Sequence, residues 1–232
     1  MRLNPDIALL QEAATSPPPD YGGYQHISGT PRRRDDAEQR FRSVMLVRGR
    51  IIDRISLHGF QTPGLVPPLV DGNTLGAVVE LARGETVRVI NMYIPPWTTL
   101  RPDGRRVWLH GEVLETLRRF GRFGDLPWVI GGDLNLSETF DLRSKKPRGN
   151  KAFLDAMAAC GLTECLRHSQ GRLVPTYRHR SGSVEHQIDH LFVNGTMLKR
   201  LQSCNTLAES EVFHPRPRLS DHLPIMADFA PR

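Results

Sequence analysis

Carboxylates, an amide and a histidine stand at the ends of four apolar runs, where strands would leave a core. They are Glu12 after IALLQ, Asp133 and Asn135 after WVIGG, Asp189 within HQIDHLFV, and Asp221 and His222 before LPIMADF. Isolated ionised carboxylates are expensive to bury, so several that converge on one place require a cation or a basic partner. Hard oxygen ligands select Mg²⁺ or Mn²⁺ over zinc, and Mg²⁺ takes one or two carboxylates together with substrate phosphate oxygens.

Such a set of side chains suits the hydrolysis of a phosphoester. A bound metal would offset phosphate charge, a carboxylate would orient water, and a protonated histidine or the metal would stabilise the leaving oxygen. An aspartate beside a histidine holds one imidazole tautomer and favours its protonated form. These residue types therefore indicate a metal-dependent phosphoesterase.

Each of these residues also has a purely structural interpretation. Glu12 could be an ordinary strand-end carboxylate, Asp189 could pair with an arginine, and the SDH stretch at 220–222 could be a capping turn. His186 and His190 are expected to be structural or solvent-facing rather than ligands. The joint occurrence of all four motifs at strand ends favours the functional interpretation.

The stretch GGDLNLSETF at 131–140 poses a question, because a buried strand ends there in two glycines. In a strand-like extension alternate residues share one face, so Asp133 and Asn135 are expected to point the same way. Glycine, aspartate and asparagine are also turn residues, and taken alone the stretch indicates a polar turn.

The overall composition fits a soluble globular protein with a polyanionic partner. A chain of 232 residues suits one large domain with a substantial core. The net charge is +6, with basic clusters at 31–34 and 143–148, which favours nucleic acid above other partners. This indication is weak, because a basic run is more often a solvated loop than a binding site.

The cysteines and the amino terminus bear on location. Cys160, Cys165 and Cys204 are an odd, scattered set without zinc-type spacing, so we expect reduced thiols that serve packing. No apolar run approaches the ~20 residues that span a bilayer, and the first residues lack the pattern of a secretory signal. We therefore expect a cytoplasmic protein, a monomer without a membrane partner.

The hydrophobic pattern predicts many strands with few helices between them. Strands are expected at 6–12, 43–48, 51–57, 186–194 and 222–229, a hairpin at 75–96, helices near 107–120 and 150–160, and a proline-rich loop at 60–73. The strands 43–48 and 51–57 are expected to pair around Gly49 and Arg50, the hairpin to turn at 83–85, and Gly161 to cap the second helix. This order predicts an α+β sandwich of two packed sheets with helices outside.

Five stretches, in this order, resemble the endonuclease/exonuclease/phosphatase superfamily, and within it the exonuclease III-like nucleases and the non-LTR retrotransposon endonucleases. They are PDIALLQE, VRVINMYIPP, WVIGGDLNLS, PTYRHRSGSVEHQIDHLFVN and LSDHLPIMADF, between residues 5 and 229. The resemblance implies a four-layer α+β fold over residues 1–232, in which two packed mixed β-sheets are flanked by helices. The site would lie where the loops of the two sheets meet.

The resemblance also implies a role for each candidate residue, with Mg²⁺ (or Mn²⁺) as the cofactor. The implied roles are metal binding for Glu12, a place near the metal for Asp221, orientation of the attacking water for Asp133, contact with the scissile phosphate for Asn135, a catalytic pair for Asp189 and His222, and a phosphate contact for Tyr93 in MYIPP.

The amino terminus departs from the family pattern. The family normally opens with a strand that carries a site asparagine and then a helix, whereas this sequence starts at MRLNPDIALLQE. We therefore expect a domain truncated at its amino terminus, with open sheet edges and weaker phosphate positioning.

Three functions remain on the sequence alone. The first is a Mg²⁺-dependent phosphodiesterase, endonuclease or exonuclease, that hydrolyses the nucleic-acid backbone, with DNA favoured over RNA as the partner. The second is a phosphatase or phosphodiesterase of phosphoinositides or of other small or lipid phosphates. The third is a nucleic-acid-binding module with a decayed site. The loops at 17–42, 60–73 and 141–149 would decide the substrate.

Overall fold

The computed structural model describes residues 3–14, 20–31, 37–55, 73–96, 98–100, 104, 106–108, 110–111, 113–114, 125–143, 145, 148–215 and 219–231. The helices and strands of this part are, in chain order, β1 Ile7–Ala14, β2 Gln25–Gly29, β3 Phe41–Val47, β4 Gly49–Arg54, β5 Thr74–Leu81, β6 Thr86–Tyr93, β7 Thr98–Leu100, β8 Arg106–Trp108, β9 Trp128–Asp133, α2 Glu138–Arg143, α3 Asn150–Ala159, β10 Leu162–Glu164, α4 Cys165–Gln170, β11 Tyr177–Arg178, β12 Val184–His186, β13 Asp189–Asn194, α5 Gly195–Leu198, β14 Leu201–Thr206, α6 Glu209–Val212 and β15 Ile225–Phe229. Within these residues, no helix is both long enough and apolar enough to cross a membrane.

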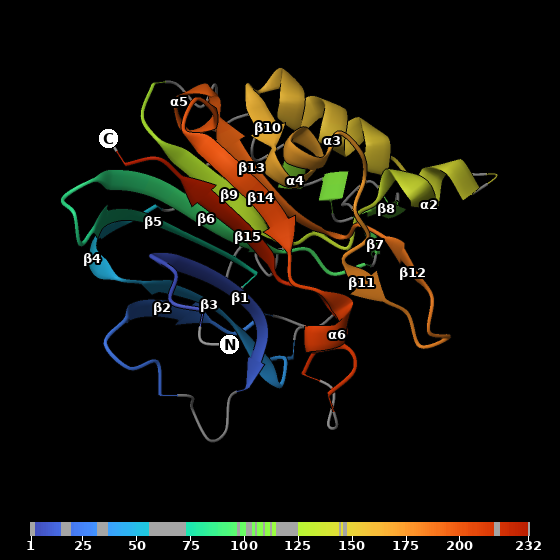
Figure 1. Cartoon of the computed structure of the whole chain (residues 1–232). Helices are drawn as coiled ribbons and strands as arrows, with labels where there is room; N and C mark the ends of the chain where they lie inside the picture. The colour runs from blue at the N-terminus through green and yellow to red at the C-terminus, as the bar shows by residue number, and fades with distance from the viewer. Residues whose placement is uncertain are drawn as a thin grey trace.

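A six-stranded mixed sheet in the order β10-β13-β9-β6-β5-β4 forms the centre of the fold (Figure 1). The strands β6 and β9 run parallel, and the other neighbours run antiparallel. The hairpin predicted at 75–96 is confirmed as β5 and β6. Its turn is closed by a bond from Leu81 N to Glu85 O of 2.8 Å, and Gly84 there takes a φ of 83° that favours glycine.

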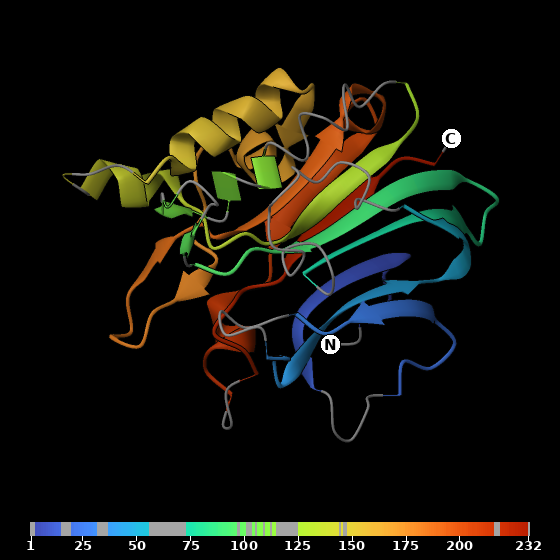
Figure 2. The same ribbon diagram turned by 180° about the vertical axis from the view of Figure 1, so that it is seen from behind.

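The central strands are apolar on both faces because both faces are covered. Ile90 and Met92 of β6 belong to an apolar cluster with α3, whereas Val87 and Val89 belong to a cluster with β2, β3, α4 and β14. This alternation explains the nearly continuous apolar run in the sequence. It places α3 and the three-stranded sheet on opposite sides of the central strands, as the two opposite views show (Figures 1 and 2).

Two smaller antiparallel sheets complete this side of the core. One has the order β1-β3-β2, and the other joins β14 to β15. Among the described residues, β1 pairs on one side only, with β3, and β15 pairs on one side only, with β14. Mixed α/β architecture is thus as predicted, whereas the paired strands outside the central sheet are antiparallel rather than mixed.

The predicted pairing of 43–48 with 51–57 is wrong. The strands form, but β3 belongs to the three-stranded sheet, whereas β4 pairs with β5 in the central sheet. A single residue, Arg48, separates the two strands, and this is too short for a two-residue hairpin turn. Instead Gly49, with φ 148°, carries the chain between the sheets. A Cβ atom there would lie 2.1 Å from Glu80 O.

The other predicted elements differ in their ends. The helix at 150–160 is confirmed as α3, with Phe153 and Met157 buried and Gly161, at φ 84°, just beyond its end. The strands predicted from 186 and 222 begin later, as β13 at Asp189 and β15 at Ile225. In the helix predicted near 107–120, residues 107–108 instead form part of strand β8, residues 110–111 and 113–114 are helical, and the rest lies outside the described residues. The loop at 60–73 lies outside them except for its last residue.

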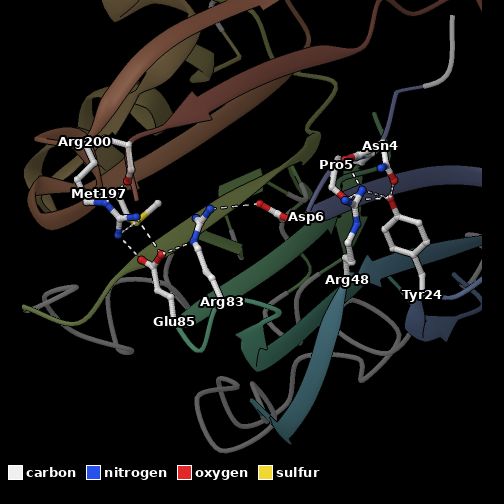
Figure 3. Close-up of polar contacts among 10 residues, drawn as sticks. Asn4, Pro5, Asp6, Tyr24, Arg48, Arg83, Glu85, Met197 and Arg200 are labelled. Atoms are coloured by element: carbon white, nitrogen blue, oxygen red, sulfur yellow. Dashed lines mark hydrogen bonds and ion pairs between the residues drawn. The ribbon is translucent and has the colours of Figure 1, made fainter. Parts of the chain in front are cut away.

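Ion pairs anchor the start of β1 to the central sheet (Figure 3). Glu85, with 5% of its side chain exposed, pairs with Arg200 and with Arg83, the latter at 3.1 Å. Arg83 also lies 3.5 Å from Asp6, directly before β1. The hydrogen bond from Arg200 lowers the pKa of Glu85 and outweighs burial, which works to raise it. The two guanidinium groups therefore connect the β5–β6 turn to β1 and to the start of β14.

Arg48 holds the residues that precede β1. Its guanidinium donates to the carbonyl oxygens of Asn4 and Pro5 and lies over the ring of Tyr24, whose hydroxyl donates to Pro5 O at 2.8 Å (Figure 3). These contacts fix β1 at its beginning, although only one of its edges is paired within the part of the chain that the structure describes.

Candidate active site

Three of the predicted site residues lie side by side across the central strands. Tyr93 is the last residue of β6 and pairs with Asp133, the last residue of β9. Asp133 in turn pairs with Asp189, the first residue of β13. The strands β6 and β9 are parallel, so their carboxyl ends meet at one edge of the sheet. The register thus gathers residues from positions 93, 133 and 189 in one row.

Asp133 and Asn135 contact each other through a turn rather than through strand alternation. Asp133 Oδ1 accepts from Asn135 N at 2.9 Å, and Oδ2 accepts from Asn135 Nδ2 at 3.0 Å. The strand β9 has ended, and Asn135 takes a φ of 49°. The prediction that both share one face of an extended strand is therefore replaced by a turn in which the amide orients the carboxylate.

The two glycines of GGDLN are required by close neighbours on both sides. A Cβ atom at Gly131 would lie 2.8 Å from His190 O of β13. A Cβ atom at Gly132 would lie 2.0 Å from Met92 O of β6 and 2.8 Å from Gln11 Nε2, and its φ is 139°. Glycine thus allows β9 to hold Asp133 between two closely packed neighbours.

Asp189 and His222 form a hydrogen-bonded pair. Both carboxylate oxygens of Asp189 lie 3.0 Å from His222 Nδ1. Burial works to lower the pKa of His222, but the bond and charge of Asp189, with the charges of Asp133 and Asp221, outweigh it and raise this pKa to about 9. The imidazole is therefore held in its protonated form at neutral pH.

Glu12 reaches the row from β1. Its Oε1 accepts a hydrogen bond from Tyr93 Oη at 3.2 Å. Burial first, and then the charge of Glu12, raise the pKa of Tyr93 far above its ordinary value, so the phenol remains a donor. Among the residues described, Glu12 and Asn135 are the non-glycine residues with positive φ. Such strained backbone is typical of functional sites.

Asp133 is the most buried carboxylate of the group, with 5% of its surface exposed. Burial first, and then the charge of Asp189, raise the pKa of Asp133 well above its ordinary range, and His222 opposes this change. The charges of Asp133 and Asp189 thus act on the His222 imidazolium, and Glu12 acts in turn on Asp133. The carboxylates of Asp133, Asp189 and Glu12 offer oxygen donors of the kind that a hard divalent cation prefers.

Comparison with known proteins agrees with this geometry. The sequence profile described as the endonuclease/exonuclease/phosphatase family matches residues 2–222. The chain belongs to this family. The resemblance inferred from the five sequence stretches is therefore confirmed. A search of curated protein sequences gave no match.

Solved structures of the family share the fold. The 3′ phosphatase NExo from Neisseria, bound to a product DNA hairpin, is 19% identical at a TM-score of 0.68, over 97% of this chain and 89% of that one. An AP endonuclease from Archaeoglobus fulgidus is 18% identical at a TM-score of 0.68, with the same coverage. The endonuclease domain of TRAS1, a telomere-specific non-LTR retrotransposon, is 18% identical at a TM-score of 0.60, over 97% of this chain and 85% of that one. At these identities the likeness establishes the fold.

Two sets of residues at the candidate site could bind a metal: Asp133, Asp189 and His222, and the predicted Glu12 and Asp221. Ligand atoms of Asp133, Asp189 and His222 lie within 4.8 Å of one another. However, the pair of Asp189 with His222 already satisfies one carboxylate, and a protonated imidazole is a poor ligand. Glu12, predicted as a metal ligand, and Asp221, predicted near the metal, lie outside this group of three. Asp221 directly precedes His222, and its carbonyl accepts from Arg178 N at 2.8 Å.

Sequence reasoning missed the residues that hold the Asp189–His222 pair. Thr176, fully buried, accepts the backbone N–H of Asp189 at 3.2 Å through its hydroxyl. The ring of Tyr177 lies 5.0 Å from that of His222, and the two backbones form a β-bridge. Both residues lie in the stretch PTYRHR at 175–180. The position of this stretch shortly before Asp189 was the available signal. His190 is buried and its Nε2 lies 2.9 Å from Leu136 O, in line with the structural role expected for it.

Proposed function

We propose that the protein is a Mg²⁺-dependent phosphodiesterase that hydrolyses the backbone of nucleic acid, with DNA as its substrate. The observation that carries this proposal is the row of Tyr93, Asp133 and Asp189 with His222 bonded at its end. The net charge of +6 favours a polyanionic substrate. The Neisseria and Archaeoglobus structures, described as a DNA-bound phosphatase and an AP endonuclease, support DNA.

The side chains have complementary roles in water attack on a phosphodiester. Asp133, oriented by Asn135, takes a proton from the water whose oxygen forms the new bond to phosphorus. His222, protonated and bonded to Asp189 through Nδ1, gives a proton from Nε2 to the leaving oxygen as the old P–O bond breaks. The buried Asp133 carboxylate is a stronger base than an exposed one, because burial disfavours its charged form.

Glu12 is the proposed ligand of the cation, with Asp221 near it. The cation would supply a Lewis acid that offsets the charge of the substrate phosphate. Tyr93 remains a hydrogen-bond donor to Glu12 and holds the carboxylate toward the row. The carboxylate oxygens of the site are the feature that suits a hard cation.

The proposal includes the complete fold expected of the family. We infer a four-layer sandwich in a single domain over residues 1–232. The apolar clusters on both faces of the central sheet support it, since each face must be covered.

A phosphomonoester at a DNA 3′ end is the second candidate substrate, favoured because the Neisseria neighbour is described as a 3′ phosphatase. Purified protein with Mg²⁺ would be incubated in parallel with intact duplex, abasic duplex, 3′-phosphorylated duplex and a phosphoinositide, with Asp133→Ala as the control. Cleavage of a DNA backbone supports the proposal, and release of phosphate from the 3′ end alone favours the monoesterase. Turnover of the phosphoinositide only, or no metal-dependent turnover of any substrate, would contradict both.

A further inference from the structure

A buried asparagine beneath the candidate site bonds to both strands of the β1–β3 pair. Asn91 has 0% of its surface exposed and lies on β6 two residues before Tyr93, so both side chains face β1. Its Nδ2 donates to Leu10 O at 3.2 Å and to Val44 O at 2.9 Å. Its Oδ1 accepts from Gln11 Nε2. A single amide thus contacts three polar groups around one point in the pairing of β1 with β3.

At this point the ladder contains a β-bulge. The register between β1 and β3 shifts between Leu10 and Ala13, so that Gln11 and Glu12 together oppose the single residue Ser43. A bulge leaves one residue unpaired and redirects its side chain. Glu12 takes a φ of 55° within it, and its carboxylate reaches the hydroxyl at the end of β6. The bulge therefore sets the direction of Glu12.

Without the bulge, β1 and β3 would pair residue by residue along their whole length. Two strands without the bulge would alternate side chains strictly, and a shift by one residue moves a side chain to the other face. The left-handed backbone of Glu12, with φ 55°, is strained and persists only where surrounding contacts hold it. The amide of Asn91 and the side chain of Gln11 are the polar contacts that adjoin it from beneath.

We infer that Asn91, acting through Gln11 and the bulge, is a positioning residue that fixes Glu12 for cation binding. The inference rests on the proposed function in that Glu12 is taken as the ligand of the cation. Without the amide, Leu10 O and Val44 O lose a donor inside the protein, and Gln11 loses its acceptor. The bulge then loses its support, and Glu12 loses its fixed direction.

Binding of Mn²⁺ to the purified protein tests the inference without any substrate. The EPR signal of free Mn²⁺ measures how much of the ion is bound. The variants are Asn91→Leu, which removes all three bonds, and Asn91→Asp, which keeps only the acceptor for Gln11. Glu12→Gln is the reference for a lost ligand. We expect both Asn91 variants to raise the Kd for Mn²⁺ by about tenfold or more, the range typical of residues that orient a metal ligand.

Asn194 provides the matched control. It is an asparagine with 1% of its surface exposed at the far end of β13, and its amide bonds to Leu126 O at 2.8 Å. Asn194→Leu should lower thermal stability as Asn91→Leu does, but leave the Kd for Mn²⁺ within about twofold of the native value. If an Asn91 variant fails to fold, Gln11→Met is measured in its place. It removes the bond from Gln11 Nε2 to Asn91 Oδ1 and leaves the other two bonds of Asn91.

A metal-free structure of the Asn91→Leu variant gives a second readout. In it, the register shift between Leu10 and Ala13 should be lost. Native Mn²⁺ affinity in the folded variants, or a retained bulge, would overturn the inference while native DNA cleavage left the proposed function standing. Weakened Mn²⁺ binding in a protein that cleaves no substrate would support the inference and contradict the proposed function. If the native protein binds no Mn²⁺, the inference is wrong.

Discussion

Both carboxylate oxygens of Asp189 lie 3.0 Å from Nδ1 of His222, a residue 33 positions later in the chain. The carboxylate begins β13 in the central sheet, whereas the histidine precedes β15 in a separate sheet. This contact joins the two sheets at the proposed site and fixes which imidazole nitrogen faces the substrate.

Asp189→Asn should therefore lower the catalytic rate by about 100-fold or more, because the imidazole loses its anionic partner and its protonated form is less favoured. NMR titration of the metal-free protein should give His222 a pKa of about 9 in the native chain and a lower pKa in the variant. Asp228→Asn, on β15 and bonded to Ser203 Oγ, is the control. An unchanged rate in Asp189→Asn would show that the pair has no catalytic role.

Tyr93→Phe removes the hydroxyl that donates to Glu12 at 3.2 Å and keeps the ring that packs against Phe41. A hydrogen bond to a charged group contributes about 1.5–3 kcal/mol to stability, so the melting temperature should fall by several degrees. Because this hydroxyl holds Glu12, the proposed metal ligand, we also expect activity to fall about tenfold or more. Steady-state kinetics and thermal unfolding would check this. Tyr24→Phe, which loses the bond to Pro5 O far from the row, should keep full activity.

Gly132→Ala tests the close packing around β9. The added Cβ atom would lie 2.0 Å from Met92 O at a φ of 139°, so strain and steric clash add together. We expect a loss of at least about 3 kcal/mol in the free energy of unfolding, with loss of activity. Gly84→Ala separates the two causes, because its φ is 83° but no atom lies within 4 Å of the added Cβ. That variant should lose only about 1 kcal/mol, and equal losses in urea unfolding would refute the packing argument.

The ion pairs of Glu85 should contribute stability that depends on pH. Its pKa is lowered in the folded protein, so the contribution is present above the unfolded value of about 4.3 and is lost as the pH falls through the folded value. Glu85→Gln should lower the free energy of unfolding at pH 7 by about 2–4 kcal/mol, since it leaves Arg200 without its partner.

Denaturant unfolding of both proteins between pH 3 and 8 measures this difference, which should shrink below about pH 4. Glu80→Gln is the matched control, because the pair of Glu80 with Arg50 is exposed and should contribute less than about 1 kcal/mol. A difference for Glu85→Gln that does not vary with pH would contradict the electrostatic explanation.

The site residues could be found from the sequence because each stands where an apolar run ends. A carboxylate after WVIGG or within HQIDHLFV is unusual enough to mark a strand end with a function. The register that sets Asp133 between Tyr93 and Asp189 could not be predicted, because it depends on pairing between strands far apart in the chain.

The fold was predictable to the level of its elements and its family, but not of all its pairings. Adjacent runs at 43–48 and 51–57 suggested a hairpin, yet their link is too short for a turn and the chain passes between sheets instead. Asn91 was overlooked, although a lone amide in the apolar run VRVINMYIPP was a visible signal. Its three contacts arise from β1 and β3, which only the tertiary structure brings near.

The most direct test of the proposed function is nicking of supercoiled plasmid by the purified chain in the presence of Mg²⁺. Parallel reactions would contain EDTA, and a second set would use Asp133→Asn, which keeps the shape of the side chain but removes its charge. We predict nicking by the native chain with Mg²⁺, none with EDTA, and a rate at least about 100-fold lower for the variant. Nicking that persists in the variant or in EDTA would contradict the account, because the activity would then arise outside this site.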